Sequence, residues 1–368
     1  MNTLYLEING EEVGFDHFWL RDHCSTNFDA STNQRIVETN DIPADVRPIS
    51  VQRENGHVEI EWNDHHRSQY EMAWLDKNRP ISANLGHNNI YPAEWLADRV
   101  TWDASSELDL PPFAFDQIMQ EESVLAEAFA QIRKVGFAVV KGIPVTREDS
   151  INLIQRFGPR GYAIRETYFG RVFEMTGNLE HSDMGYATGD LHAHIDGTYY
   201  DDTPRLIVFH LLAFNGTGGK TLMVDGLHIA EKLRAENPKA FETLTQVNVP
   251  CQFIENGCYY LAAAPTIRLH PITGEIVQFR FNNEDRAEMH LPLEQMHDFY
   301  QAYRALTVHV RDDANKRWIQ QEPGMMVFVD NWRVMHGRSG FSGHRHLLGA
   351  YVSNEDFVNK QRILEQSG

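Results

Sequence analysis

Two histidines and one aspartate in this sequence have the types and spacing of ligands for a single metal ion. His194 and Asp196 are two positions apart, and residues two apart on a β-strand point to the same side of the strand. The third ligand must come from another strand, which fits His336, far downstream. Two histidines and a carboxylate are the ligand set of a non-haem Fe(II) facial triad, which leaves positions open for a bidentate cosubstrate and dioxygen.

The step from His194 to Asp196 is weak evidence by itself, because the chain has 18 histidines and His192 lies in the same stretch. The alternative interpretation is a polar turn that binds no metal. Three downstream segments, in the expected order, favour the metal site: FRFNN at 279–283, GMMVFVDNWR at 324–333 and RHLLGAY at 345–351.

The elements that must position these residues are mostly strands. Alternating or apolar runs predict strands over 135–140, 206–214, 220–225, 266–269, 276–281 and 325–329. Helical periodicity predicts helices over 121–134, 147–157, 227–237 and 293–308. Beyond residue 205 this is strand upon strand with only two helices, which favours a jelly-roll barrel of the cupin type.

The first part of the chain is predicted to be a small β-rich domain over 1–100. Residues 3–8 alternate, Asn9-Gly10 is a hairpin turn, and residues 11–15 return. Residues 101–118 are predicted to be a linker, being acidic and containing Pro111-Pro112. A large domain then covers 119–368.

Composition excludes several classes of protein. The net charge of −19 argues against nucleic acid and anionic membrane surfaces as partners. Three cysteines, Cys24, Cys251 and Cys258, imply no disulfide framework. No leader-like N-terminus or long apolar run is present, so we expect a soluble cytoplasmic protein.

Over nearly its whole length the chain resembles the γ-butyrobetaine and trimethyllysine hydroxylase group of taurine-dioxygenase-like Fe(II)/2-oxoglutarate oxygenases. The resemblance is carried by FWLRDHC at 18–24, DNWRVMHGR at 330–338 and the 345–351 segment. It implies a mainly β fold with flanking helices, in which a double-stranded β-helix (jelly-roll) catalytic domain follows a small β-rich N-terminal domain. It also implies Fe(II), 2-oxoglutarate and O2 as cofactor and cosubstrates, and a homodimer.

The resemblance also assigns roles to residues. His194, Asp196 and His336 match the iron ligands. Arg345 and Thr221 match the residues that hold 2-oxoglutarate, and a guanidinium suits a carboxylate because it forms two parallel hydrogen bonds. The alternatives are a surface ion pair for Arg345 and a β-propensity choice for Thr221.

The substrate implied by the resemblance carries a trimethylammonium group, which aromatic rings hold by cation–π attraction. The matching cage positions are Phe169, Phe173, Tyr186 and Tyr351, with Asp183 beside them. The alternative for the two phenylalanines is an ordinary core position. The anionic end of the substrate is expected to meet Tyr199, Asn282, Asn283 and Arg286.

Among substrates, the sequence favours 2-(trimethylammonio)ethylphosphonate, hydroxylated at C1, with γ-butyrobetaine and trimethyllysine as alternatives. A betaine-binding protein without catalysis is a remoter alternative, as is a metal enzyme that does not use 2-oxoglutarate. The group often carries a zinc site in its first domain. Here only Cys24 and His66 remain, since Thr26 and Asp29 stand where cysteines are expected. We therefore predict no zinc.

Overall fold

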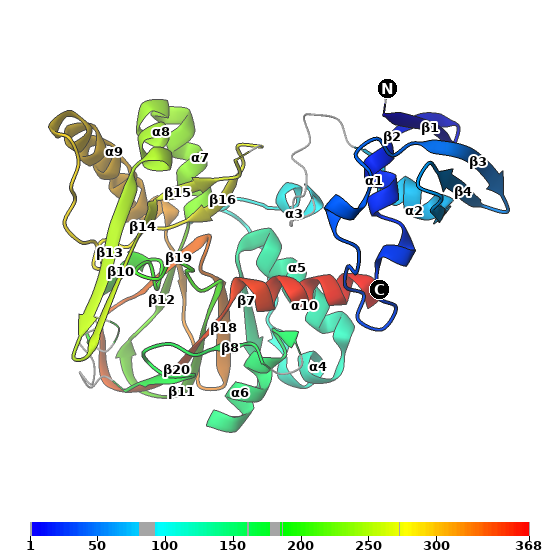
Figure 1. Ribbon diagram of the computed structural model, residues 1–368. Helices are drawn as coiled ribbons and strands as arrows, with labels where there is room; N and C mark the ends of the chain where they lie inside the picture. Colours follow the sequence, from blue (N-terminus) through cyan, green and yellow to red (C-terminus); the bar gives the residue numbers. More distant parts are fainter. Residues whose placement is uncertain are drawn as a thin grey trace. The chain divides into compact units, whose positions relative to one another are not determined.

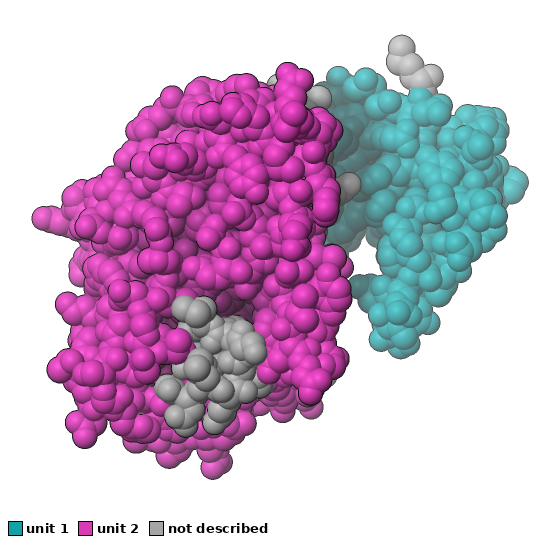
Figure 2. Space-filling view, turned by 90° about the vertical axis from the view of Figure 1, so that its left-hand side faces the viewer, with its two compact units in different colours: residues 1–88 teal, residues 89–368 magenta. Residues whose placement is uncertain are grey.

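The computed structural model describes residues 2–80, 93–159, 162–176, 185, 187–271 and 273–367. The chain packs into two compact units, residues 1–88 and 89–368, coloured separately in Figure 2. The expected linker, 101–118, therefore lies within the second unit. Trp102 explains why: its ring is 1% exposed, and its indole nitrogen donates to the carbonyl of Val135 at 2.7 Å.

The first unit contains two small sheets. The predicted hairpin is confirmed: β1 (Thr3–Ile8) and β2 (Glu11–Asp16) pair in an antiparallel way. Asn9 and Gly10 both have positive φ, as a tight two-residue turn requires. The other sheet orders β3 (Pro48–Glu54), β4 (His57–Trp62) and β5 (Arg67–Glu71). Short helices α1 (His17–Asp22) and α2 (Met72–Lys77) and 3-10 turns at Ser25–Asn27 and Thr39–Asp41 complete the unit.

The four positions related to a zinc site have partners within the protein. The Cys24 thiol lies 3.2 Å from both Thr26 Oγ1 and His66 Nε2. Asp29 instead accepts hydrogen bonds from Ser31 and Thr32, which lower the pKa of its carboxyl group to about 2. A thiol and one imidazole are too few ligands for a structural zinc ion, and the absence of zinc stays a prediction.

The second unit is built around two main sheets, and the jelly-roll prediction is confirmed. The larger sheet contains β6 (Phe113–Ala114), β7 (Phe137–Lys141), β18 (Met325–Asp330), β11 (Leu206–Gly218), β20 (Phe341–Val352) and β8 (Ile164–Arg165), with β9 (Phe173–Met175) also pairing with β20. The smaller sheet orders β10 (Leu191–His194), β19 (Val334–Arg338), β12 (Thr221–Asp225) and β17 (Arg317–Ile319).

Helices cover the larger sheet on the side away from the site. They are α4 (Phe115–Gln120), α5 (Glu122–Val135), α6 (Arg147–Gln155) and α10 (Asn354–Ser367), and Figure 1 shows α5 and α10 beside β7 and β18. Their contact with the sheet is a run of stacked rings. Phe129 lies 5.1 Å from Phe157 and 4.8 Å from Phe357, and Phe157 lies 3.9 Å from Phe328 of β18.

A second layer of helices and hairpins adjoins the smaller sheet (Figure 1). It consists of α7 (Gly226–Glu236), α8 (Pro238–Gln246), α9 (Leu293–Arg311), β13 (Asn248–Glu255), β14 (Cys258–Pro265), β15 (Ile267–Leu269) and β16 (Ile276–Phe279). The 3-10 turn Asp313–Asn315 follows α9, and α3 (Ala93–Ala97) lies near the start of the unit.

Helix α8 differs from the sequence expectation, which placed only two helices in this region. Pro238, which directly follows the helix predicted over 227–237, occupies the first turn of a new helix. The Asn237 side chain caps that helix by accepting from the Ala240 amide. Among the described residues, no helix combines the length and apolar composition needed to cross a bilayer.

A buried histidine makes the stability of the fold sensitive to acid. His210 on β11 is fully buried, and its Nδ1 lies 2.7 Å from Ser150 Oγ, which itself donates to the Thr146 carbonyl. His210 Nε2 has no partner among the described residues. Burial therefore lowers the pKa of His210 to about 4 from an ordinary value of 6.5.

Between pH 6.5 and 4, His210 is protonated in the unfolded chain but stays neutral in the folded chain. Lowering the pH through this window therefore stabilises the unfolded state relative to the fold. We expect this group to remove roughly 3 kcal/mol of unfolding free energy over that window. Denaturant unfolding measured at a series of pH values should show that the unfolding free energy falls less steeply with decreasing pH in His210→Gln than in the native chain. The exposed His290→Gln variant is the control, and identical acid declines for native and His210→Gln chains would contradict the expectation.

Candidate metal and cosubstrate site

The three predicted metal ligands come together. His194 ends β10 and His336 lies on β19, and the two residues are direct partners across these antiparallel strands. One ligand atom from each of His194, Asp196 and His336 lies within 4.8 Å of the others. His194 Nε2 is 2.9 Å and His336 Nε2 is 3.5 Å from the same oxygen, Oδ1 of Asp196.

The position of Asp196 has a different origin from the one expected. Strand β10 ends at His194, so strand alternation does not place Asp196. Instead, the buried side chain of Asn331 holds its main chain. Asn331 Oδ1 accepts from the Asp196 amide at 2.9 Å, and Asn331 Nδ2 donates to the Asp196 carbonyl at 3.0 Å. One amide side chain therefore fixes both polar groups of the ligand's backbone.

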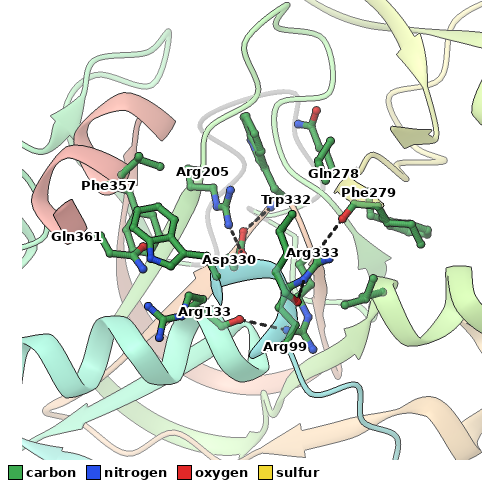
Figure 3. A pocket seen from close by; sticks show the side chains of 16 residues that line it. Arg99, Arg133, Arg205, Gln278, Phe279, Asp330, Trp332, Arg333, Phe357 and Gln361 are labelled. Carbon is green, nitrogen blue, oxygen red and sulfur yellow. Dashed lines mark hydrogen bonds and ion pairs between the residues drawn. The ribbon is translucent and has the colours of Figure 1, made fainter. Parts of the chain in front are cut away.

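The turn that carries Asn331 is itself held by ion pairs, one of which, between Arg205 and Asp330, is drawn in Figure 3. Arg205 donates to Asp330 Oδ2 at 2.8 Å. Arg333 forms two bonds to Asp225, at 3.0 and 2.8 Å, and also donates to the carbonyls of Arg133, Lys134 and Val100. The pocket behind this turn is thus lined by arginines that already have partners: Arg133, Arg205 and Arg333 pair with carboxylates, and Arg99 donates to the carbonyls of Leu96 and Ile276.

The electrostatics of the three ligands fit a bound cation. Burial disfavours charge at His194, but the hydrogen bond and charge of Asp196 raise the pKa of His194 to about 9. Burial likewise opposes ionisation of Asp196, yet the two histidines hold its pKa far below the usual range. His194 Nδ1 donates to the His192 carbonyl at 2.7 Å, so a cation bound at the site would take the place of the proton on Nε2 and meet its lone pair. These donors suit Fe(II).

Arg345 brings a buried positive charge to the cavity. Its side chain on β20 is 5% exposed and lines the same cavity as the three ligands. Among the described residues, no carboxylate pairs with it, and its charged neighbour is Arg338. Burial and that neighbour lower the pKa of Arg345 to about 10. A buried guanidinium in this state is suited to bind a carboxylate in two parallel bonds.

Thr221 lines the cavity on the side of the smaller sheet. Its hydroxyl donates to Gln321 Oε1 at 2.8 Å, and it pairs across the sheet with Arg338. The cosubstrate residues expected from the sequence therefore lie on facing sheets around one cavity, and their role in binding stays a proposal.

Aromatic side chains form the opposite wall of the cavity. Phe169, Phe173 and Tyr351 all line it, with ring centroids 6.0 Å apart for Phe169–Phe173 and 5.2 Å apart for Phe173–Tyr351. Phe173 lies flat over Gly349, where an added Cβ would come within 2.1 Å of the ring. The other two residues expected at the cage, Asp183 and Tyr186, lie outside the described residues.

The four residues expected at the anionic end of the substrate do not line this cavity. Tyr199 stacks on Phe253, with centroids 5.2 Å apart. The Asn282 side chain accepts from the amides of Glu284 and Asp285 in its own loop and donates to the carbonyl of Ile195. Asn283 is exposed, and the Arg286 guanidinium lies over the rings of Tyr303 and Tyr300 of α9. Their role in binding stays a prediction.

Several residues at the site were not singled out by the sequence. Arg338, two residues after His336, donates to the carbonyls of Gly185, Ala187 and Gly189 and so anchors the segment that enters β10. Phe253 packs against Phe169 from the β13–β14 hairpin, with centroids 5.4 Å apart. Arg338 and Asn331 lie within the 330–338 motif, which is the signal that could have found them, whereas no local pattern points to Phe253.

Comparison with known proteins adds to this geometry. Residues 101–351 match the model of the taurine catabolism dioxygenase TauD, TfdA family, and residues 3–76 match a γ-butyrobetaine hydroxylase-like N-terminal domain. Rat mitochondrial trimethyllysine dioxygenase is 32% identical, over 98% of this chain and 85% of the rat protein. The γ-butyrobetaine dioxygenase of Pseudomonas sp. (strain AK-1) is 28% identical, over 97% of this chain and 92% of that protein.

Among solved structures, a putative α-ketoglutarate-dependent taurine dioxygenase from Burkholderia xenovorans shares the fold. Its TM-score is 0.52 at 13% identity, over 68% of this chain and 92% of that one.

Removing the Arg345 guanidinium tests the cosubstrate site. We expect Arg345→Ala to weaken 2-oxoglutarate binding at least 100-fold, because truncating one partner of a buried charge pair costs about 3 kcal/mol or more. Anaerobic titration calorimetry of the Fe(II)-loaded protein measures this, and Fe(II) itself should still bind. Arg304→Ala, on the exposed face of α9, is the matched control. Unchanged 2-oxoglutarate affinity in Arg345→Ala would show that the arginine does not bind the cosubstrate.

Proposed function

The chain belongs to the taurine catabolism dioxygenase TauD, TfdA family, and on that premise we propose that it hydroxylates a small trimethylammonium compound. It is a dioxygenase that depends on Fe(II) and 2-oxoglutarate. The observation that carries the substrate class is the wall of Phe169, Phe173 and Tyr351 across the cavity from the His194–Asp196–His336 cluster. A quaternary ammonium has no hydrogen to donate, so aromatic faces are its natural partners.

The chain's own residues bind and orient the reactants. His194, Asp196 and His336 would hold Fe(II), which with 2-oxoglutarate and O2 supplies the oxidising chemistry for hydroxylating a C–H bond. Arg345 would grip the distal carboxylate of 2-oxoglutarate, and Thr221 would contact the same molecule. The aromatic wall would fix the trimethylammonium end, so that one C–H bond lies near the metal. Burial of His194, His336, Arg345 and Thr221 limits the access of water to the reacting centre.

The identity of the anionic end is a finer proposal, with separate support for each candidate. γ-Butyrobetaine and trimethyllysine are supported by the relatives that carry those names and align over nearly the whole chain. The phosphonate is supported by the sequence, through Asp183 beside the cage and Arg286 in the anion loop. Because Arg286 lies between tyrosines of α9, the phosphonate requires this loop to reach the cavity when substrate binds.

Two further expectations belong to the proposal. A homodimer is implied by the resemblance and would be detected by light scattering during size-exclusion chromatography. A betaine-binding protein without catalysis remains the rival function. The clustered triad argues against it, as does Arg345, which has no carboxylate partner among the described residues, since binding alone requires neither a metal with open positions nor a site for a second carboxylate.

A neutral analogue tests the role of the aromatic wall. Phe169 is half-buried at the wall, so Phe169→Leu removes a ring face with little disturbance to the core. We expect KM for the trimethylammonium substrate to rise roughly 5- to 30-fold, corresponding to about 1–2 kcal/mol of cation–π attraction.

The tert-butyl analogue has the same shape without the charge, so its KM should change much less in Phe169→Leu. Steady-state succinate release measures both compounds in both proteins. Equal changes for the charged and neutral compounds would contradict the cation–π role and leave Phe169 as a packing residue.

Substrate choice is tested by succinate release from the iron-loaded protein with 2-oxoglutarate and O2. The trimethylammonium ethylphosphonate, γ-butyrobetaine and trimethyllysine are offered in parallel, and hydroxylated product is measured in each reaction. We expect coupled turnover, with succinate and product in equal amounts, for at least one of the three. Turnover of the phosphonate alone would assign Arg286 and the asparagines to a dianion, and preference for a carboxylate compound would refute that assignment. Silence with all three would refute the proposed function.

A further inference from the structure

The two oxygens of the Asp196 carboxylate have different partners. Oδ1 lies 2.9 Å from His194 Nε2 and 3.5 Å from His336 Nε2, so it faces the point where the three ligands meet. Oδ2 accepts a hydrogen bond from the Tyr351 hydroxyl at 2.9 Å. The geometry thus presents one oxygen to the metal position and holds the other away from it.

Other movements of Asp196 are already restricted. Asn331 fixes its backbone amide and carbonyl, at 2.9 and 3.0 Å. What remains free is rotation of the carboxylate about its side-chain bonds. The hydrogen bond from Tyr351 opposes this rotation from the Oδ2 side, because it ties Oδ2 to a residue of the facing sheet, while His194 contacts Oδ1.

Tyr351 is well placed to be a rigid anchor. It lies on β20, where it pairs with Ile207 of β11 on one side and Arg165 of β8 on the other. Its side chain is 6% exposed, and its ring packs against Phe173 with centroids 5.2 Å apart. The ring forms part of the aromatic wall, while the hydroxyl reaches the metal ligand. One side chain therefore contacts both halves of the site.

We propose that Tyr351 is a positioning residue that keeps Asp196 a one-oxygen ligand of Fe(II), in addition to forming part of the cation site. A carboxylate can bind a metal through one oxygen or both. If Asp196 rotated to use both, it would occupy a position that 2-oxoglutarate or O2 requires on an octahedral ion. The hydroxyl of Tyr351 prevents this by holding Oδ2.

The same residue couples the substrate to the metal ligand, a consequence that rests on the proposed function. A trimethylammonium group against the ring restrains the side chain that in turn restrains Asp196. An occupied cation site therefore also steadies the ligand set, and an empty one leaves it looser. This favours oxidation of 2-oxoglutarate when substrate is present over futile oxidation when it is absent.

The Tyr351→Phe variant separates the two tasks, because it keeps the ring and removes the hydroxyl. We expect Fe(II) affinity, measured by competition with a metal-binding dye, to fall about 10-fold or more, the usual effect of losing a partner of a metal ligand. The charge-transfer absorption of the anaerobic Fe(II)–2-oxoglutarate complex should weaken at matched concentrations. Succinate formed per hydroxylated product should rise above the native ratio, while the substrate KM stays close to native.

The control is Tyr303→Phe, since Tyr303 is also a buried tyrosine and its hydroxyl has no partner among the described residues. It should match the native protein in all readouts. Tyr351→Leu removes ring and hydroxyl together and should add a raised substrate KM to the metal defect, with folding checked by circular dichroism. Native Fe(II) affinity and a native succinate-to-product ratio in Tyr351→Phe would overturn the proposal, and a change confined to KM would leave Tyr351 with the ring role alone.

The metal and absorption measurements use no trimethylammonium compound. A failure of the substrate proposal would therefore leave them unaffected, and a failure of the Tyr351 proposal would appear in them directly.

Discussion

The buried pair between Arg333 and Asp225 connects most of the parts on which the site depends. Both residues are at most 5% exposed, and their side chains join through two hydrogen bonds. Asp225 also caps α7 through the Leu227 amide and accepts from the Trp102 amide, while Arg333 reaches carbonyls at the end of α5. Removing either partner would leave an uncompensated buried charge, which typically costs about 3–5 kcal/mol. The turn that carries Asn331 is fixed by this pair, and Asn331 fixes Asp196.

The site is therefore assembled from the outside inwards. Helix ends and ion pairs hold the β18–β19 turn, the turn holds the ligand backbone, and strand pairing sets the two histidines side by side. The groups that make these contacts are largely buried, so their hydrogen bonds are strong, and leaving one of them without a partner would cost folding free energy. The result is a preorganised set of donors with few groups that need to move when a metal binds.

The two sheets contribute different kinds of residue to the cavity between them. The ligands and Thr221 come from the smaller sheet and the residues beside it, whereas Arg345, Tyr351 and Phe173 come from β20 and its neighbour in the larger sheet. A jelly roll brings such residues face to face because inward-pointing side chains alternate along each strand. Arg345 and Tyr351 are an even number of positions apart on β20 and both line the cavity.

The first unit is a separate compact body in which Cys24 forms hydrogen bonds with Thr26 and His66.

The sequence by itself determined the kind of fold and the candidate metal ligands. Its alternating strands predicted the jelly roll and its Asn-Gly turn the first hairpin, because these depend on local periodicity. Residue types and spacing predicted the triad, whose three residues lie together in the structure, and the family resemblance implied Arg345. Only the tertiary structure decided how they are used. Asp196 lies beyond the end of β10 and is placed by Asn331, Tyr351 reaches its carboxylate, Arg286 lies against tyrosines of α9, and Pro238 begins a helix. The first three are contacts between residues distant in sequence, and such contacts are set by packing, which no local pattern records.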